Sequence, residues 1–298
     1  MLFAIGAGDM VVGVTHECDY PVEAPQLPRL TANALDLEGA SPLEIDRHIK
    51  RAVHAGSSIY GLDKQLLHEL CPDVIVTQEL CQVCAVSYGQ VKRAVRTLSG
   101  NIPIMSLEPE NLDGILDTAI ALGEATGHQE NAALLVASLR HRIDVVESAR
   151  AEHTASPARV VCIEWTDPLM AGGHWVPEMV RCAGGTDPLG VEGQPSHSVE
   201  WSTVLEADPE VMVLMPCGFD LERTCALAGG VTGHPAFGQT RCAHSGRLAA
   251  VDGSAYFNRP GPRIVDGLEI LAAILRTDPG GALPTGARWI PSGVASPL

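Results

Sequence analysis

Three cysteines and a histidine follow short apolar runs, and their side chains are of the types that ligate metals or carry redox chemistry. Cys81 and Cys84 form a Cys-x-x-Cys pair just after one apolar run, while His16 and Cys18 follow another. Thiolates and imidazoles are the usual zinc ligands, and a Cys-x-x-Cys pair also serves as a redox dithiol. A third interpretation is that the thiols pack as small apolar groups. The candidate metal ligands are Cys18, Cys81, Cys84 and Cys217, with His16 and His174 as further candidates.

The apolar runs themselves indicate strands. Short β-branched runs alternate with longer helical patterns, which is typical of parallel α/β units. We expect strands at 11–14, 74–77, 104–107, 159–165, 211–215 and 248–252. In such folds the loops at the carboxyl ends of the strands line the ligand crevice. The thiols and His16 are therefore expected at the wall of that crevice.

Helix signals lie between the expected strands. Ser41-Pro-Leu-Glu44 is a capping box with proline at the first helical position, so a helix begins there. Other helices are expected at 63–70, 177–183, 201–207 and 263–275. From 111 to about 151 apolar residues recur at helical spacing, with a break at Gly127. The sequence thus predicts an α/β protein: a lobe at 1–110, a linking helix at 111–152, a second lobe at 153–298, and a ligand cleft between the lobes.

Aromatic residues gather in the loops that are expected to face this cleft, although only 4% of the chain is aromatic. Aromatic rings around a few polar groups are typical of a small-molecule pocket. The candidate ligand-binding residues are His16, Tyr88, Trp165, His174, Trp175, Phe219, Tyr256 and Arg259. The rings could stack on a flat macrocycle or pack in the core, and His174 could ligate a metal or only donate a hydrogen bond. The remaining cysteines, Cys71, Cys162, Cys182, Cys225 and Cys242, are expected in the core.

Five segments resemble a known family. They are 16–21 (HECDYP), 77–87 (TQELCQVCAVS), 173–179 (GHWVPEM), 215–223 (MPCGFDLER) and 256–263 (YFNRPGPR). They are similar to the cobalamin-binding branch of the class III substrate-binding proteins of ABC importers. The resemblance covers nearly the whole chain and implies two Rossmann-like lobes bridged by a long helix. It also implies a corrinoid, such as cobalamin, held between the lobes.

Three features depart from that family. The first strand of the family is absent, no export or lipoprotein signal is visible, and only the second lobe offers an acid, Glu222, for docking to an ABC permease. As written, the chain is expected in the cytoplasm. If translation begins upstream, we expect it in the periplasm or another extracytoplasmic space.

Composition excludes several classes of partner. The chain has 298 residues and a formal net charge of −16, which argues against binding to nucleic acid or to an anionic membrane. No apolar run approaches the roughly 20 residues that span a bilayer. Nine cysteines, dispersed and odd in number, are not typical of a disulfide scaffold.

The leading hypothesis is a non-enzymatic binding protein for a corrinoid or a similar metal-containing ligand. One alternative is a cytosolic metal or metal-cluster protein that uses Cys18, Cys81 and Cys84 with His16 or Cys217. The other is an enzyme acting on a corrinoid or tetrapyrrole, with Cys81 or Cys217 as nucleophile or lower ligand. The chain contains no Gly-x-Ser-x-Gly elbow and no Walker loop, so the sequence does not itself point to catalysis.

Overall fold

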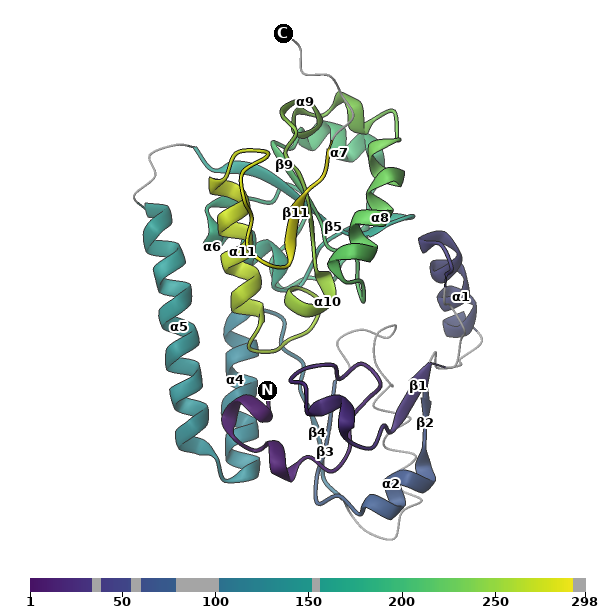
Figure 1. Cartoon of the computed structure of the whole chain (residues 1–298), viewed down its shortest axis with the longest axis vertical. Helices are drawn as coiled ribbons and strands as arrows, with labels where there is room; N and C mark the ends of the chain where they lie inside the picture. The colour runs from purple at the N-terminus through teal and green to yellow at the C-terminus, as the bar shows by residue number, and fades with distance from the viewer. Residues whose placement is uncertain (34–38, 55–59, 79–101, 152–155, 292–298) are drawn as a thin grey trace. The chain divides into compact units, whose positions relative to one another are not determined.

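The computed structural model describes residues 1–33, 39–54, 60–78, 102–151 and 156–291. These residues form a mixed α/β chain that divides into two compact units (Figure 1). Unit 1 comprises Met1–Pro109 and Asp117–Leu135, and unit 2 comprises Glu110–Leu116 and Val136–Leu298. The chain passes between the units through helices α4 (Leu112–Thr126) and α5 (Gln129–Ala151). The predicted interruption at Gly127 is confirmed, because this residue has φ +74° and separates the two helices.

Unit 1 contains two short strand pairs. Strands β1 (Thr31–Asn33) and β2 (Tyr60–Leu62) are antiparallel, whereas β3 (Ile75–Thr77) and β4 (Ile104–Ser106) are parallel. The latter confirm the strands predicted at 74–77 and 104–107. The remaining elements of the unit are η1 (Phe3–Ile5), η2 (Gly8–Met10), η3 (Ala24–Gln26), α1 (Pro42–His54) and α2 (Lys64–Leu70).

The predicted strand at 11–14 is wrong. Only Val14 forms an isolated bridge, to Arg29, and residues 11–13 are irregular. Val12 is 44% exposed, so this apolar run is not buried on both faces as a central strand would be.

Unit 2 is built on one sheet in the order β11-β10-β9-β5-β6-β8, with β7 pairing with β5. Its strands are β5 (Ala158–Thr166), β6 (Leu169–Ala171), β7 (Gly185–Thr186), β8 (His197–Ser198), β9 (Val211–Leu214), β10 (Leu248–Val251) and β11 (Ala287–Trp289). Strands β5, β9 and β10 are parallel neighbours. Every residue of β9 and β10 is buried, as expected for strands covered on both faces. Because both faces of these strands are buried, the sequence is continuously apolar at β9 and β10 and does not alternate with polar residues.

Helices cover both faces of that sheet. They are α6 (Val176–Ala183), α7 (Trp201–Ala207), α8 (Leu221–Thr232), α9 (Arg241–Ser245), α10 (Gly253–Tyr256) and α11 (Ile264–Arg276), with the 3-10 turn η4 (Phe237–Gln239). In Figure 1, α6 and α11 lie together on one side of the strands, and α7, α8 and α9 lie on the other. On the second side, Val161 and Ile163 of β5 form a core cluster with Val204 of α7 and Val231 of α8.

None of the described helices combines the length and the apolar character that crossing a membrane requires.

Candidate functional site

Three loops of unit 2 meet beyond the carboxyl ends of the parallel strands β5, β9 and β10. The backbone N–H of Cys217, after β9, donates to the carbonyl of Glu164 near the end of β5, over 3.1 Å. The N–H of Ser254, after β10, donates to the carbonyl of Phe219 over 3.1 Å. Because neighbouring parallel strands end at the same edge, their loops converge where α/β folds bind ligands. We call Glu164, Trp165, Cys217, Phe219, Ser254 and Arg259 the strand-end wall.

Two aromatic rings of the wall pack against each other. The rings of Trp165 and Phe219 meet edge to face, with their centres 5.6 Å apart and an interplanar angle of 68°. The guanidinium carbon of Arg223 lies 3.9 Å from the centre of the Phe219 ring, within the range of a cation–π contact. Trp165 is half-buried, and its indole N–H donates to the carbonyl of Asp167 over 3.1 Å. The partly exposed indole is therefore held in one orientation.

The wall also carries two opposite charges, each in contact with a serine. Ser196 donates its hydroxyl proton to Oε2 of Glu164. On the other side, Nη2 of Arg259 donates to Oγ of Ser254 over 2.7 Å. A carboxylate accepts hydrogen bonds and a guanidinium donates them. Together they could bind both donors and acceptors at the edge of an apolar ligand.

His174 lies in a tightly held loop of the same unit. Its backbone is in the left-handed region, at φ +53°. The backbone N–H of His174 donates to the carbonyl of Gln194 over 2.6 Å, and the carbonyl of His174 accepts from the N–H of Gly193 over 2.9 Å. Its Nδ1 is buried and has no partner among the described residues. Burial lowers the pKa of His174, and the nearby carboxylate of Glu110 opposes this effect in part. The imidazole is therefore favoured in its neutral form, as a metal ligand or a neutral hydrogen-bonding group would be.

Trp175 and Phe219 are more buried than a ligand-facing ring needs to be. Trp175 is 4% exposed, and its indole N–H donates to the carbonyl of Phe257 over 2.8 Å. Phe219 is 5% exposed and lies beneath Trp165 and Arg223. The role that the structure gives these two rings is packing, and their contact with a ligand stays a prediction. Tyr256 is half-buried and lines a separate hollow beside α11.

Unit 1 holds the other described candidates. The ring nitrogens of His16 lie 2.7 Å from Oγ1 of Thr31 and 3.1 Å from Oδ1 of Asn33, so this imidazole is bound to the β1 strand. Its ring centre is 5.0 Å from that of Tyr60. The Sγ atom of Cys18 lies 3.4 Å from Oγ1 of Thr15.

The predicted metal ligands are only partly described. Cys81, Cys84 and Tyr88 lie outside the described residues. Across the described part of the chain, no group of three or more His, Cys, Asp or Glu side chains is close enough to hold a metal ion. A set that includes Cys81 and Cys84 stays a prediction. Two other expectations are corrected, because Cys71 is exposed at the end of α2 and Cys225 is half-buried, rather than both being in the core. Cys162, Cys182 and Cys242 are buried as expected.

Ser196 and Arg223 belong to the site but were not predicted from the sequence. Ser196 lies 32 residues from its partner Glu164, in a loop without a regular pattern, so no local signal points to it. Arg223 had a local signal. Asp220 is the N-cap of α8, and Arg223 follows Phe219 by four residues, the spacing at which side chains can meet across a helical turn.

Two α/β units, connected through α4 and α5, give the chain the fold of two-lobed α/β binding proteins. Solved structures share this fold, among them the following three. A possible iron-binding solute-binding protein of Staphylococcus epidermidis is 19% identical, with TM-score 0.69 and coverage of 93% of this chain and 94% of the other. The periplasmic heme-binding protein RhuT of Roseiflexus is 20% identical, with TM-score 0.67 and coverage of 92% of each chain. The vitamin B12-binding protein BtuF of Vibrio cholerae is 20% identical, with TM-score 0.65 and coverage of 92% and 91%.

The family follows from the sequence comparison. A family model of periplasmic binding proteins matches residues 1–255, so the chain belongs to the periplasmic binding protein family. Among curated proteins, no sequence matches the chain significantly.

Proposed function

We propose that this protein is an extracytoplasmic binding protein that captures a corrinoid and delivers it to an ABC permease. The observation that carries the proposal is the strand-end wall of unit 2. It combines a half-buried, braced indole, Trp165, with the opposite charges of Glu164 and Arg259. We assign no catalytic role to the protein.

The chemistry of the wall suits a large, flat ligand with polar substituents. The Trp165 ring offers an apolar face, and stacking on it buries ligand surface at about 25 cal/mol per Å². Amide substituents contain both N–H donors and carbonyl acceptors, which matches one carboxylate and one guanidinium. A haem offers carboxylates at its edge, which Arg259 could bind but Glu164 would repel. This difference, together with the five cobalamin-type segments, favours a corrinoid over a haem.

In this proposal the remaining candidate ligand-binding and metal-ligating residues contact the same ligand. His16 and Tyr88 would contribute further contacts, and His174 would bind as a neutral imidazole. Cys18, Cys81, Cys84 and Cys217 would face the ligand as thiols or, if they converge, would hold a metal ion. The heme-binding protein RhuT and the vitamin B12-binding protein BtuF have this fold, which supports the view that it accommodates ligands of such a size.

Delivery would use Glu222 as a docking acid. Its side chain is 73% exposed, and its two carboxylate oxygens accept hydrogen bonds of 2.6 and 3.1 Å from Arg288. These hydrogen bonds lower the pKa of Glu222, so the carboxylate stays ionised. An arginine of a permease would have to compete with Arg288 for it. We therefore expect Arg288→Ala to strengthen permease docking and Glu222→Gln to weaken it.

A ligand panel tests the proposal. Purified protein is titrated with dicyanocobinamide, cyanocobalamin and hemin while absorbance spectra and heats of binding are recorded. We expect one corrinoid per chain with a dissociation constant of about 1 µM or tighter. Tight binding of hemin alone would replace the corrinoid with a haem, and absence of heat with all three at high micromolar concentration would contradict the macrocycle altogether.

A further inference from the structure

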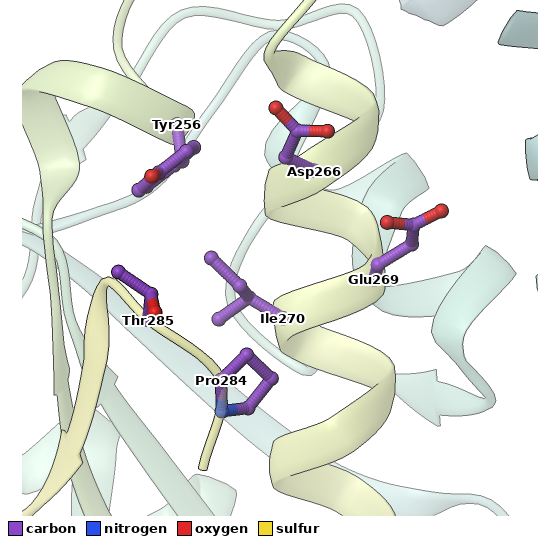
Figure 2. Close-up of a pocket in the computed structure, with 6 residues that line it drawn as sticks. All are labelled: Tyr256, Asp266, Glu269, Ile270, Pro284 and Thr285. Atoms are coloured by element: carbon purple, nitrogen blue, oxygen red, sulfur yellow. The ribbon is translucent and has the colours of Figure 1, made fainter.

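Unit 2 contains a hollow of about 250 Å³ that is separate from the strand-end wall. It lies between helix α11 and the segment that leads into β11, and Figure 2 shows the side chains around it. The lining residues are Tyr256, Asp266, Glu269, Ile270, Pro284 and Thr285. This volume is slightly below that of a typical ligand pocket, so the hollow suits a small molecule rather than a macrocycle.

The only formally charged side chains of this lining are two carboxylates. Both oxygens of Glu269 accept hydrogen bonds from Arg142 of α5, over 2.8 and 2.7 Å. Asp266 accepts from the same guanidinium through Oδ1, over 2.5 Å. One guanidinium thus compensates two carboxylates. Oδ2 of Asp266 has no partner among the described residues, and the side chain is 38% exposed, so this oxygen can still accept a proton donor.

The rest of the lining is apolar or aromatic. Ile270 is 3% exposed on α11, and Figure 2 shows its side chain directed toward Pro284 and Thr285. The ring of Tyr256 packs on Gly286, where a Cβ atom would lie 2.5 Å from a ring carbon. The guanidinium carbon of Arg263 lies 5.8 Å from the centre of the same ring, so a cation already sits near it. The Tyr256 ring, held in place by this packing, attracts cations through its π face.

We propose that this hollow binds a small alkylammonium ion. The ammonium group would donate to Oδ2 of Asp266, and the alkyl chain would lie against Ile270 and Pro284 beside the Tyr256 ring. A primary amine is protonated at neutral pH, since its pKa resembles that of a lysine side chain. A neutral molecule of the same shape would lose the interaction with the carboxylate. An anion would meet two carboxylates in the lining.

The test uses n-butylamine as the probe and n-butanol as its neutral counterpart, with ligand-observed NMR titration of the whole protein at pH 7. Asp266→Asn removes the proposed acceptor. Thr285→Trp fills the hollow from an exposed position and leaves both carboxylates in place. Asp278→Asn is the matched control, because it removes one exposed negative charge beyond the end of α11 and outside the hollow.

We expect butylammonium to bind with a dissociation constant on the order of 1 mM. Affinity should fall at least about fivefold in Asp266→Asn and be lost in Thr285→Trp, while Asp278→Asn behaves as the unmodified protein. Thermal unfolding of each variant checks that it is folded. Equal binding of butylamine to Thr285→Trp would overturn the proposal, as would equal weakening by Asp278→Asn or equal affinity for butanol. Absence of binding to the unmodified protein at tens of millimolar would overturn it too.

Discussion

Replacing Trp175 with phenylalanine should destabilise unit 2 strongly. The indole N–H of Trp175 donates to the carbonyl of Phe257 over 2.8 Å, and both residues are almost fully buried. Leaving that carbonyl without its donor costs about 1–3 kcal/mol. The smaller ring leaves part of the indole volume empty, which adds about 1 kcal/mol. The free energy of unfolding should therefore fall by about 2–4 kcal/mol.

The assay is thermal unfolding followed by calorimetry. For a domain of roughly 150–250 residues, each 1 kcal/mol shifts Tm by about 2–4 °C, so Tm should fall by about 4–16 °C. Trp201→Phe is the matched control. Its indole stacks on His234 with ring centres 4.5 Å apart, and its N–H makes no hydrogen bond within the described part of the chain. A fall in Tm for Trp175→Phe that is no larger than the fall for Trp201→Phe would contradict this prediction.

Three further predictions concern backbone approach, a buried acid and a helix cap. Gly173→Ala should destabilise unit 2 by about 1–3 kcal/mol or prevent its folding, because a Cβ would lie 2.3 Å from the Ser196 nitrogen; urea unfolding measures this. Burial raises the pKa of the Asp187 carboxyl in the folded protein. The folded protein therefore binds this proton more tightly than the unfolded chain does, and the free energy of unfolding falls as the pH rises through the folded-state pKa. The stability of Asp187→Asn relative to the unmodified protein should accordingly improve from about pH 3 to pH 7, and a flat or opposite trend would contradict this assignment. Asp220→Ala should cost about 1 kcal/mol, because Oδ1 of Asp220 accepts from the N–H of Arg223 at the start of α8; an unchanged urea midpoint would contradict this.

Signals that depend on a few consecutive residues were readable from the sequence. The capping box is confirmed, since the backbone N–H of Ser41 donates to Oε2 of Glu44 over 2.9 Å and α1 begins at Pro42. Helix α7 has the predicted bounds, and strands β5, β9 and β10 agree with their predictions within about one residue. Capping and burial on both faces act locally, so they leave a local pattern.

Elements that depend on distant partners were not readable. Strands β6 and β8 have only three and two residues, and they depend on their partners: β6 pairs with β5, and β8 pairs with β6 at the edge of the sheet. Helix α8 was not predicted; it contains Gly229 and Gly230, which weaken its helical pattern. At 11–14 the error is the reverse: a strand was predicted where none forms. An apolar β-branched pattern alone does not supply a pairing partner.

The site residues also divide into those with a local signal in the sequence and those that depend on distant partners. Strand-end position identified Trp165, and the structure places its ring on that of Phe219. Position could not reveal that Trp175 turns into the core, because its hydrogen-bond partner Phe257 is 82 residues away. The serine that contacts Glu164 likewise comes from a distant loop. Composition and spacing therefore select candidates, and tertiary packing decides which of them keeps an exposed face.

We propose that the strand-end wall of unit 2 binds a corrinoid through the face of Trp165. It is tested most directly by titrating dicyanocobinamide into the unmodified protein, Trp165→Ala and the control Trp201→Ala. Loss of one stacked ring is worth about 1–3 kcal/mol, so Trp165→Ala should weaken binding by about 5- to 150-fold while Trp201→Ala has little effect. Equal affinity of all three proteins, or equal loss in both variants, would contradict the account.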